Sequence, residues 1–342
     1  MDHLKDCHTV LISGCGGGYD IFCGLDLFFE LHAKGYQVIL GSYSFTDNKL
    51  IKRYGCQIDP HCYRITHSVN FNEQEYIEEC TKEIKIPPVS VLQQIGYTAD
   101  EYVRSQLGIY GDEARKVYFP ELKMVQYLYD HYQIEVPIYC FIDGTVKTLT
   151  QAYNAVVLLE RPDTIILIDG GTDSLMTGSE KGSLGTPYED ICSIIAVHDV
   201  LHVNKKFLYL MGFNIEQHVT DDNVLHNIAH LTQQGHFIGA YAINKQREST
   251  RRYVETFMHC DPVNSIVNTA IVASLNGEYG NVCPRWIQCR LRDETIKVTP
   301  FMSFYWICDL DGVFHNLTYD VEKMRTATGA WEVSQLIIGE AL

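Results

Sequence analysis

The sequence predicts an α/β protein with a three-layer, Rossmann-like, mostly parallel sheet and antiparallel strand additions near the C-terminus. The first observation is an opening strand, helix and strand at 8–13, 20–34 and 36–43, a pattern typical of a right-handed βαβ unit. The second is a series of short apolar runs that alternate with helical patterns. The third is an aromatic, alternating pattern at 296–302 and 304–310, which favours antiparallel strands.

The opening βαβ unit is the strongest of these signals. Ile21, Leu25 and Phe28 recur at helical spacing, and Gly35 stands where a helix commonly ends. A glycine-rich segment, Gly14 to Gly18, separates the first strand from this helix and is predicted to form a turn. The remaining patterns predict helices over 72–84, 99–107, 120–132, 146–159, 186–200, 222–233, 250–259 and 265–275, and strands over 136–142, 164–168, 207–211 and 237–243.

Composition favours one compact domain that spans residues 1–342. The 46% hydrophobic and 20% charged residues are ordinary for a globular protein, and no segment has the length of apolar sequence that a membrane span needs. A net charge of -16 argues against nucleic acid as a ligand, because phosphate binding needs clustered Lys and Arg. We therefore expect a cytoplasmic protein with a small-molecule ligand and no nucleic-acid or membrane partner; a homo-oligomer is compatible with the sequence.

The glycine-rich turn is a candidate ligand-binding segment. Backbone amides of Gly16, Gly17 and Gly18 precede a helix whose first residue is Asp20, and such amides suit an anion or a ligand hydroxyl. The dinucleotide fingerprint would need glycine in place of Tyr19 and an acidic end to the second strand, so no NAD is expected. Asp20 would repel a bare phosphate, which favours a sugar, an amine or a metal-bridged phosphate.

A second candidate segment follows the apolar strand at 164–168. It supplies Asp169, Gly170, Gly171, Thr172 and Asp173 at a strand's carboxyl end, the edge where open α/β sheets bind ligands.

Carboxylates in this region suit a hard cation. Asp169, Asp173 and Glu180 are the predicted ligands of Mg²⁺, and Asp169 and Asp173 are the predicted catalytic residues, since an unpaired carboxylate can act as a base on water. Asp143, Gly144 and Thr145 end another apolar strand and are predicted to bind ligand in the same crevice. The structural alternative is that these Asp residues only cap turns and helices.

Two weaker patterns offer other chemistry. His198 and His202 stand four residues apart in a segment that superficially mimics a zinc-protease motif, and His226 and His230 repeat the spacing. Cys15, in the glycine turn, would become a nucleophile if a helix N-terminus lowered its pKa. The structural alternative is that these histidines lie on polar helix faces and that Cys15 is a small side chain that fits a tight turn.

Several of these segments resemble the prokaryotic domain of unknown function 1152 family. The resemblance is carried in chain order by Gly16 to Asp20, Tyr118 to Glu121, Asp169 to Leu175, Gly178, Glu180, Leu184, Thr186-Pro187 and Asp190. Thr186 stands where the family pattern has serine, which keeps the hydroxyl. The resemblance implies a whole-chain α/β domain and no established activity.

We therefore expect an enzyme that hydrolyses or transfers a group on a nucleotide, nucleoside or phosphosugar, with Asp carboxylates and Mg²⁺ assistance. N-glycosidic and phosphoester bonds are the expected targets. The alternative is a non-catalytic nucleotide-sensing or scaffold module, with a metal-dependent peptidase as a third possibility.

Overall fold

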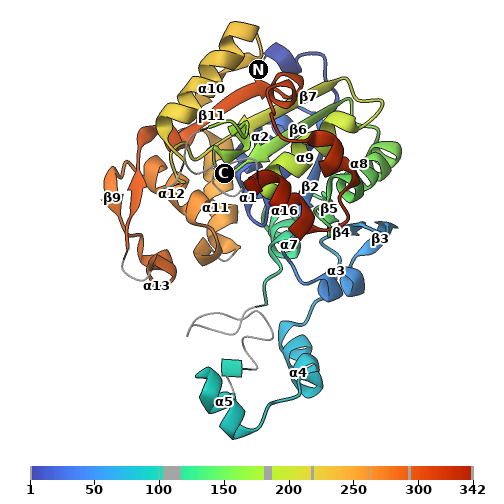
Figure 1. Cartoon of the computed structure of the whole chain (residues 1–342). Coiled ribbons are helices and arrows are strands. Elements are labelled where there is room, and N and C mark those ends of the chain that lie inside the picture. The colour runs from blue at the N-terminus through green and yellow to red at the C-terminus, as the bar shows by residue number, and fades with distance from the viewer. Residues whose placement is uncertain are drawn as a thin grey trace.

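A nine-stranded mixed sheet forms the centre of the described chain (Figure 1). The computed structural model describes residues 2–99, 101–102, 117–180, 187–216, 219–260, 262–291 and 294–339. The strand order is β3-β4-β5-β2-β1-β6-β7-β11-β8. The strands are β1 (Thr9–Gly17), β2 (Gln37–Tyr43), β3 (Cys56–Asp59), β4 (Cys62–Ile65), β5 (Ile138–Phe141), β6 (Thr164–Asp169), β7 (Lys205–Leu210), β8 (Phe237–Ala242) and β11 (Phe304–Asp309).

The five central strands, from β5 to β7, pair in parallel, and the two strands beyond each end pair antiparallel. This confirms an α/β protein whose sheet is parallel at its centre and gains antiparallel strands from the C-terminal part of the chain. The opposite edge was not expected: β3 and β4 form an antiparallel hairpin after α3 (Asn48–Tyr54).

Helices cover both faces of the sheet because alternate residues of each central strand are apolar and buried. Val10 and Ile12 join one hydrophobic cluster, whereas Leu11 joins the other. The first face packs against α1 (Asp20–Cys23), α2 (Leu25–Ala33), α7 (Pro120–Tyr132), α11 (Glu248–His259) and α12 (Ile266–Leu275). The second packs against α8 (Val146–Glu160), α9 (Tyr188–Asp199), α10 (Asp221–Gln234), α14 (Leu310–His315), α15 (Val321–Thr326) and α16 (Ala330–Gly339).

The opening βαβ unit is confirmed, but its boundaries differ from the prediction. Strand β1 continues through Gly17, so the glycine segment is mostly extended strand rather than turn. The predicted helix at 20–34 is divided at Gly24 into α1 and α2. A Cβ atom at Gly24 would lie 2.9 Å from Ile12 Cγ2, so the missing side chain lets the helix start approach the strand closely.

One predicted strand is shorter than expected, and one predicted helix lies largely outside the described residues. The predicted strand at 296–302 stops at Val298, because Pro300 begins a 3-10 turn that ends at Ser303. The short strand that remains, β10 (Ile296–Val298), pairs with β9 (Gly280–Val282) in a separate two-stranded sheet, next to α13 (Gln288–Leu291). The predicted helix at 99–107 lies largely outside the described residues.

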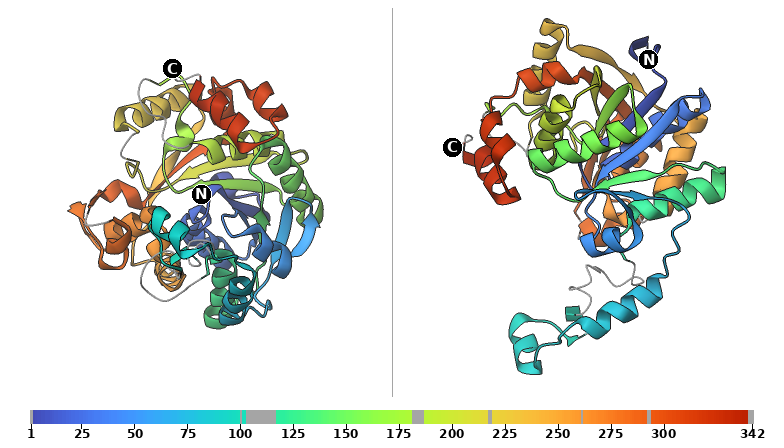
Figure 2. Two further views of the ribbon diagram at one scale, coloured as in Figure 1. Left: turned by 60° about the horizontal axis from the view of Figure 1, so that its bottom comes forward. Right: turned by 90° about the vertical axis from the view of Figure 1, so that its right-hand side faces the viewer.

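Two helices project away from the body of the molecule. Figures 1 and 2 show α4 (Glu73–Glu83) and α5 (Val89–Ile95) extending beyond the end of the sheet where α3 and α7 lie. Asn72 caps α4 as its position predicts. None of the helices in the described part of the chain is both long and apolar enough to cross a membrane.

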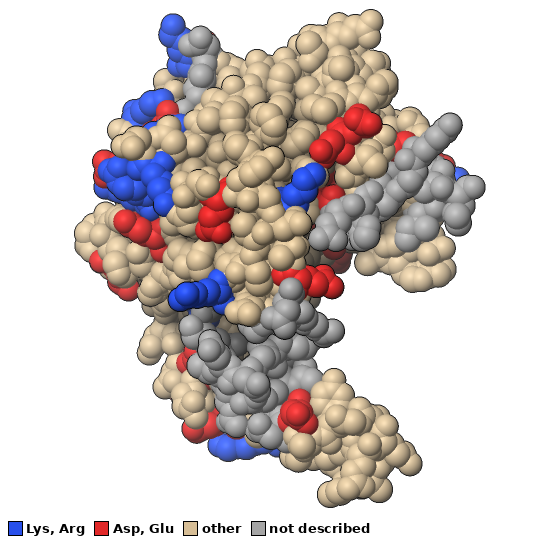
Figure 3. Space-filling model, turned by 90° about the vertical axis from the view of Figure 1, so that its left-hand side faces the viewer, with Lys and Arg blue, Asp and Glu red and all other residues tan. Residues whose placement is uncertain are grey.

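Surface charge is dispersed on the side of the molecule in Figure 3. Lys and Arg lie there in small groups, next to acidic side chains or separated by uncharged surface.

Candidate functional site

The candidate site lies where β1 and β6 end side by side in the middle of the sheet. Strand β1 leads to β2 on one side, and β6 leads to β7 on the other. Because the chain leaves these neighbouring strands in opposite directions, their carboxyl ends mark the point where the strand order reverses, the usual ligand position in an open parallel sheet.

Three carboxylates from separate segments converge at this point. Asp20 begins α1, Asp169 ends β6, and Asp190 lies in the first turn of α9. One oxygen of each lies within 4.8 Å of the others, and among the described residues this is the one group of acidic, His or Cys side chains so arranged. Asp169 and Asp190 are only 2% and 6% exposed, and no Lys or Arg in the described ranges pairs with these three carboxylates.

Asp190 is the least satisfied member of the group. Its Oδ1 atom is buried and has no hydrogen-bond partner. Burying an oxygen of a carboxylate without a partner is costly, so such an atom marks a position where a cation or donor belongs.

Glycines allow these carboxylates to approach the backbone. A Cβ atom at Gly16 would lie 2.6 Å from Asp20 Oδ2 and 3.1 Å from Asp190 Oδ1, and one at Gly170 would lie 2.8 Å from Asp20 Oδ1. A Cβ atom at Gly171 would overlap Glu216 Oε1. The glycines therefore make room for acidic side chains of the protein itself.

Those acidic side chains also occupy the donors that a phosphate would need. The amide of Gly16 donates to Asp20 Oδ2 at 2.9 Å, and a Gly170 backbone hydrogen bond also reaches Asp20. Thr172 Oγ1 donates to Glu216 Oε2 at 3.0 Å, and Ser174 Oγ donates to Asp169. The two strand ends thus present carboxyl groups, where the sequence alone predicted free amides.

Burial and mutual repulsion raise the pKa values of this group. Burial raises the pKa of Asp20 to about 7, with a further upward effect from Asp173, and raises the pKa of Glu216 to about 8. Burial, followed by repulsion from neighbouring carboxylates, raises the pKa values of Asp169 and Asp190 well above the usual range. Clusters of strongly shifted groups are common at functional sites.

Replacing Gly16 with alanine should disturb this arrangement. The added methyl group would press on Asp20 and Asp190, and overpacking of this kind costs about 1–3 kcal/mol of unfolding free energy. Gly329→Ala is the control, because no atom lies within 4 Å of its added Cβ. Chemical unfolding measures both variants, and a Gly16→Ala protein as stable as the control would contradict the packing described here.

The structure brings together some of the predicted residues. Asp169 and Asp20 belong to the convergent group, and Asp173, at 6% exposure, lies close enough to raise the pKa values of both. Gly18 has a left-handed φ of 68°, and Gly17 faces Phe45 rather than the carboxylates.

Asp143, Gly144 and Thr145 lie farther along the same sheet edge, between β5 and α8. Thr145 caps α8, and its amide donates to Asp143 Oδ1 at 3.3 Å. Tyr188 Oη donates to the carbonyl of Gly144 at 3.2 Å, which ties this loop to the start of α9.

Glu180 has different partners from those expected of a cation ligand. It accepts hydrogen bonds from the Thr177 and Gly178 amides, at 2.8 and 2.9 Å, and from Asn227 Nδ2 at 2.7 Å. These bonds lower its pKa although partial burial opposes them. Glu180 anchors its own loop to α10, and the structure does not bring it into the convergent group.

The His198–His202 pair and Cys15 are not arranged for catalysis; His226 and His230 both lie on α10, but neither belongs to the one potential metal-binding group among the described residues. Helix α9 ends at Asp199, and His202 lies beyond it with a φ of 66°, so His198 and His202 do not share a helix face. His198 stacks on Phe314 instead. Burial raises the pKa of the Cys15 thiol, the opposite of nucleophile activation. The predicted cap at Thr186 lies outside the described residues, and Pro187 takes the cap position of α9.

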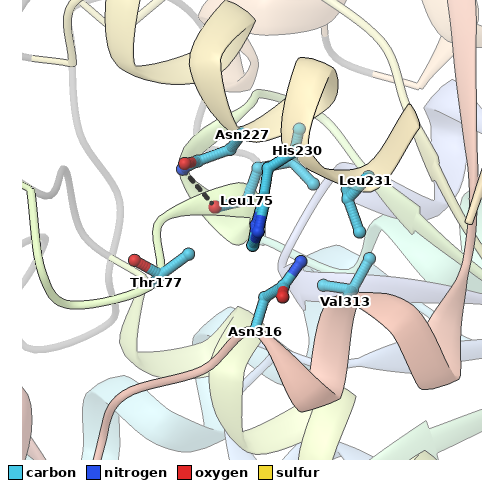
Figure 4. Close-up of a pocket in the computed structure, with 7 residues that line it drawn as sticks. All are labelled: Leu175, Thr177, Asn227, His230, Leu231, Val313 and Asn316. Carbon is cyan, nitrogen blue, oxygen red and sulfur yellow. Dashed lines mark hydrogen bonds between the residues drawn. The ribbon is translucent and has the colours of Figure 1, made fainter. Parts of the chain in front are cut away.

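A small pocket lies apart from the carboxylates, between α10 and α14 (Figure 4). His230 and Asn316 point into it from opposite sides, and Asn227 donates to the Leu175 carbonyl at 2.9 Å. Its interior of about 10 Å³ has room for about one water molecule. It is too small for a nucleotide.

The comparison with protein families found one match. A model described as a protein of unknown function (DUF1152) matches residues 114–337, more than half of the chain. The chain belongs to this family. The matched range holds Asp169, Asp173 and Asp190, whereas the glycine segment and Asp20 precede it. Searches of curated proteins and of solved structures each found no significant match.

Asp190, Glu189 and Glu216 lie at the site but are not among the residues predicted for it. Asp190 and Glu189 lie in the first turn of α9, where acidic residues are common for helix stability alone. Glu216 follows β7 in a segment without a motif. The available signal was that β7 is a further apolar strand in the same parallel set, so residues after it face the same edge.

Proposed function

We propose that this protein is a Mg²⁺-assisted enzyme that hydrolyses or transfers a group on a small polar ligand of the nucleotide, nucleoside or phosphosugar class. The observation that carries the proposal is the convergence of Asp20, Asp169 and Asp190 at the strand ends, with a buried Asp190 oxygen that has no partner. Structural acidic residues that only cap turns would not need to approach one another in this way.

The donor set fits a hard divalent cation. Asp20, Asp169 and Asp190 supply carboxylate oxygens, the ligand type that Mg²⁺ prefers, and a bound cation would offset the repulsion among them. Mg²⁺ usually retains waters, which leaves positions for substrate. When bound, it would polarise a phosphoryl or glycosidic oxygen and make a coordinated water more acidic.

Asp173 is the proposed general base. It lies in the 3-10 turn that follows Gly171 and Thr172, next to the convergent group, and a carboxylate there would accept a proton from water or from a ligand hydroxyl. Asp169 would both hold the cation and orient the ligand. Glu180 has no role in this proposal, because its oxygens are committed to Thr177 and Asn227.

The hydrogen bonds that the Gly16 and Gly170 amides already make determine how a phosphate would bind. Because Gly16 and Gly170 already donate to Asp20, a phosphate would approach through the cation rather than through a glycine cradle. Ligand hydroxyls, such as those of ribose, would be suitable donors to the carboxylates.

The fold supports the same assignment. We propose a three-layer, Rossmann-like arrangement, because the order β5-β2-β1-β6-β7 places β1 and β6 where a doubly wound sheet reverses direction. Ligands of such folds bind at that reversal, and the carboxylates lie there.

A product screen with matched variants tests the proposal. The full chain, with Mg²⁺ or with EDTA, is incubated with nucleosides, nucleotides and sugar phosphates, and mass spectrometry follows free base and released phosphate. Asp173→Asn should lower the rate at least about 100-fold, as expected for loss of a general base, and retain the fold. The exposed Asp222→Asn substitution on α10 is the control.

Each outcome has a distinct meaning. Full activity in Asp173→Asn would remove Asp173 from the mechanism. Activity that persists in EDTA would contradict the role of the cation. Ligand binding without product would instead favour the non-catalytic sensing module.

A further inference from the structure

An exposed aromatic ring stands at the border of the carboxylate site. Phe45 follows β2, and its side chain is 53% exposed. The ring packs against the Gly17 backbone so closely that any side chain at Gly17 would overlap it. Tyr43 contacts the ring edge to face, with centroids 5.6 Å apart.

Hydrogen bonds to Glu121 and Phe141 anchor the segment that carries this ring. Thr46 Oγ1 donates to Glu121 Oε2 at 2.8 Å, and Ser42 Oγ donates to Glu121 Oε1 at 3.3 Å. The Ser44 amide donates to the Phe141 carbonyl at 2.9 Å. Phe45 is therefore an exposed apolar side chain on an anchored loop, so little conformational entropy is lost when a ligand covers it.

The ring is near enough to the carboxylates for one ligand to reach both. A Cβ atom at Gly16 would meet Asp20 and Asp190, and one at the next residue, Gly17, would meet Phe45. Because consecutive Cα atoms are about 3.8 Å apart, the near edge of the ring lies at most roughly 11 Å from Asp20 Oδ2. A nucleotide is long enough to place its sugar or phosphate at one point and its base at the other.

We propose that Phe45 is a stacking platform for the base of a nucleoside 5′-phosphate whose sugar-phosphate part lies at Asp20, Asp169 and Asp190. This rests on the proposed function and narrows its ligand class: a phosphosugar without a base would leave the ring uncovered. An aromatic ring accepts every base because each base has a π-face. Phe45 therefore favours base-bearing ligands without selecting among bases.

Calorimetric titration of the full chain with AMP, CMP and ribose 5-phosphate, each with Mg²⁺, tests this inference. The wild-type protein should bind both nucleotides more tightly than ribose 5-phosphate. Phe45→Ala should weaken nucleotide binding by about 5- to 150-fold, the usual effect of losing one stacking contact, and leave ribose 5-phosphate binding unchanged. Phe45→Trp should retain nucleotide binding.

Phe301→Ala is the matched control, because Phe301 is also 53% exposed. Equal wild-type affinity for the nucleotides and ribose 5-phosphate, an equal loss for all three ligands in Phe45→Ala, or no nucleotide binding would each overturn the inference. Nucleotide binding that depends on Phe45 but neither needs Mg²⁺ nor yields product would support the stacking role and reject the proposed enzyme.

Discussion

Asp190→Asn should lower the affinity for Mg²⁺ at least about 100-fold and raise the thermal stability of the metal-free protein. Changes to groups that only support a metal ligand already cost 10–100-fold in affinity, and the loss of a direct ligand should cost no less. In the metal-free protein, burial and the neighbouring carboxyl groups raise the pKa of Asp190, which costs stability at pH 8 because the unfolded chain ionises this side chain freely; asparagine has no such cost. We expect a gain of about 1–3 kcal/mol at pH 8.

The opposite signs of these two effects make the prediction specific. A misfolded variant would lose both metal affinity and stability, whereas a lost cation site in an intact fold loses only the first. Glu180→Gln is the control, because Glu180 is a sequence-predicted ligand that the structure places on Thr177 and Asn227. Calorimetry and thermal unfolding should show unchanged Mg²⁺ affinity in Glu180→Gln. A loss there with no loss in Asp190→Asn would contradict the ligand set.

Metal-free protein should become less stable as pH rises from 5 to 8. Burial raises the pKa values of Asp20 and Glu216 to about 7 and about 8, so between their ordinary values and these values the folded protein holds more protons than the unfolded chain. Stability is then highest at the acid end and is lost as pH rises through the folded-state pKa values. The expected loss is on the order of 3 kcal/mol, a Tm decrease of at least about 5 °C.

Mg²⁺ and one matched variant separate this effect from general charge repulsion. Saturating Mg²⁺ at pH 8 should restore about 2.7 kcal/mol at a concentration 100 times its Kd. Glu216→Gln should flatten the metal-free profile between pH 7 and 8, because its side chain cannot release a proton. A metal-free Tm that is equal or higher at pH 8 than at pH 5 would show that these carboxylates do not carry the assigned pKa values.

Local signals predicted the parallel centre of the sheet well. Thr164–Asp169 is a buried strand and Pro120–Tyr132 is a helix because apolar spacing, proline and glycine act over a few residues. The same signals missed the break at Gly24, since it depends on contact with Ile12 on β1. They also missed the β3–β4 hairpin, whose short strands lack a strong pattern.

The residues of the candidate site also divide into those that local sequence signals identify and those that depend on contacts distant in the chain. Asp20, Asp169 and Asp173 were identifiable because each follows or ends an apolar strand beside glycine. Asp190 appeared only as part of the family resemblance and not as a predicted site residue, because an acidic residue in a helix's first turn has an adequate structural explanation. Glu180 has the right chemistry for a cation ligand, but sequence could not show that its oxygens face Thr177 and Asn227.

In the proposed site, Asp20, Asp169 and Asp190 together hold one divalent cation. A crystal structure of the full chain grown with Mn²⁺ tests it most directly, because anomalous scattering locates the ion independently of its ligands. We expect one anomalous peak about 2.0–2.4 Å from an oxygen of each of the three carboxylates. Empty density there in crystals that bind Mn²⁺ elsewhere, or a peak at Glu180, would contradict it.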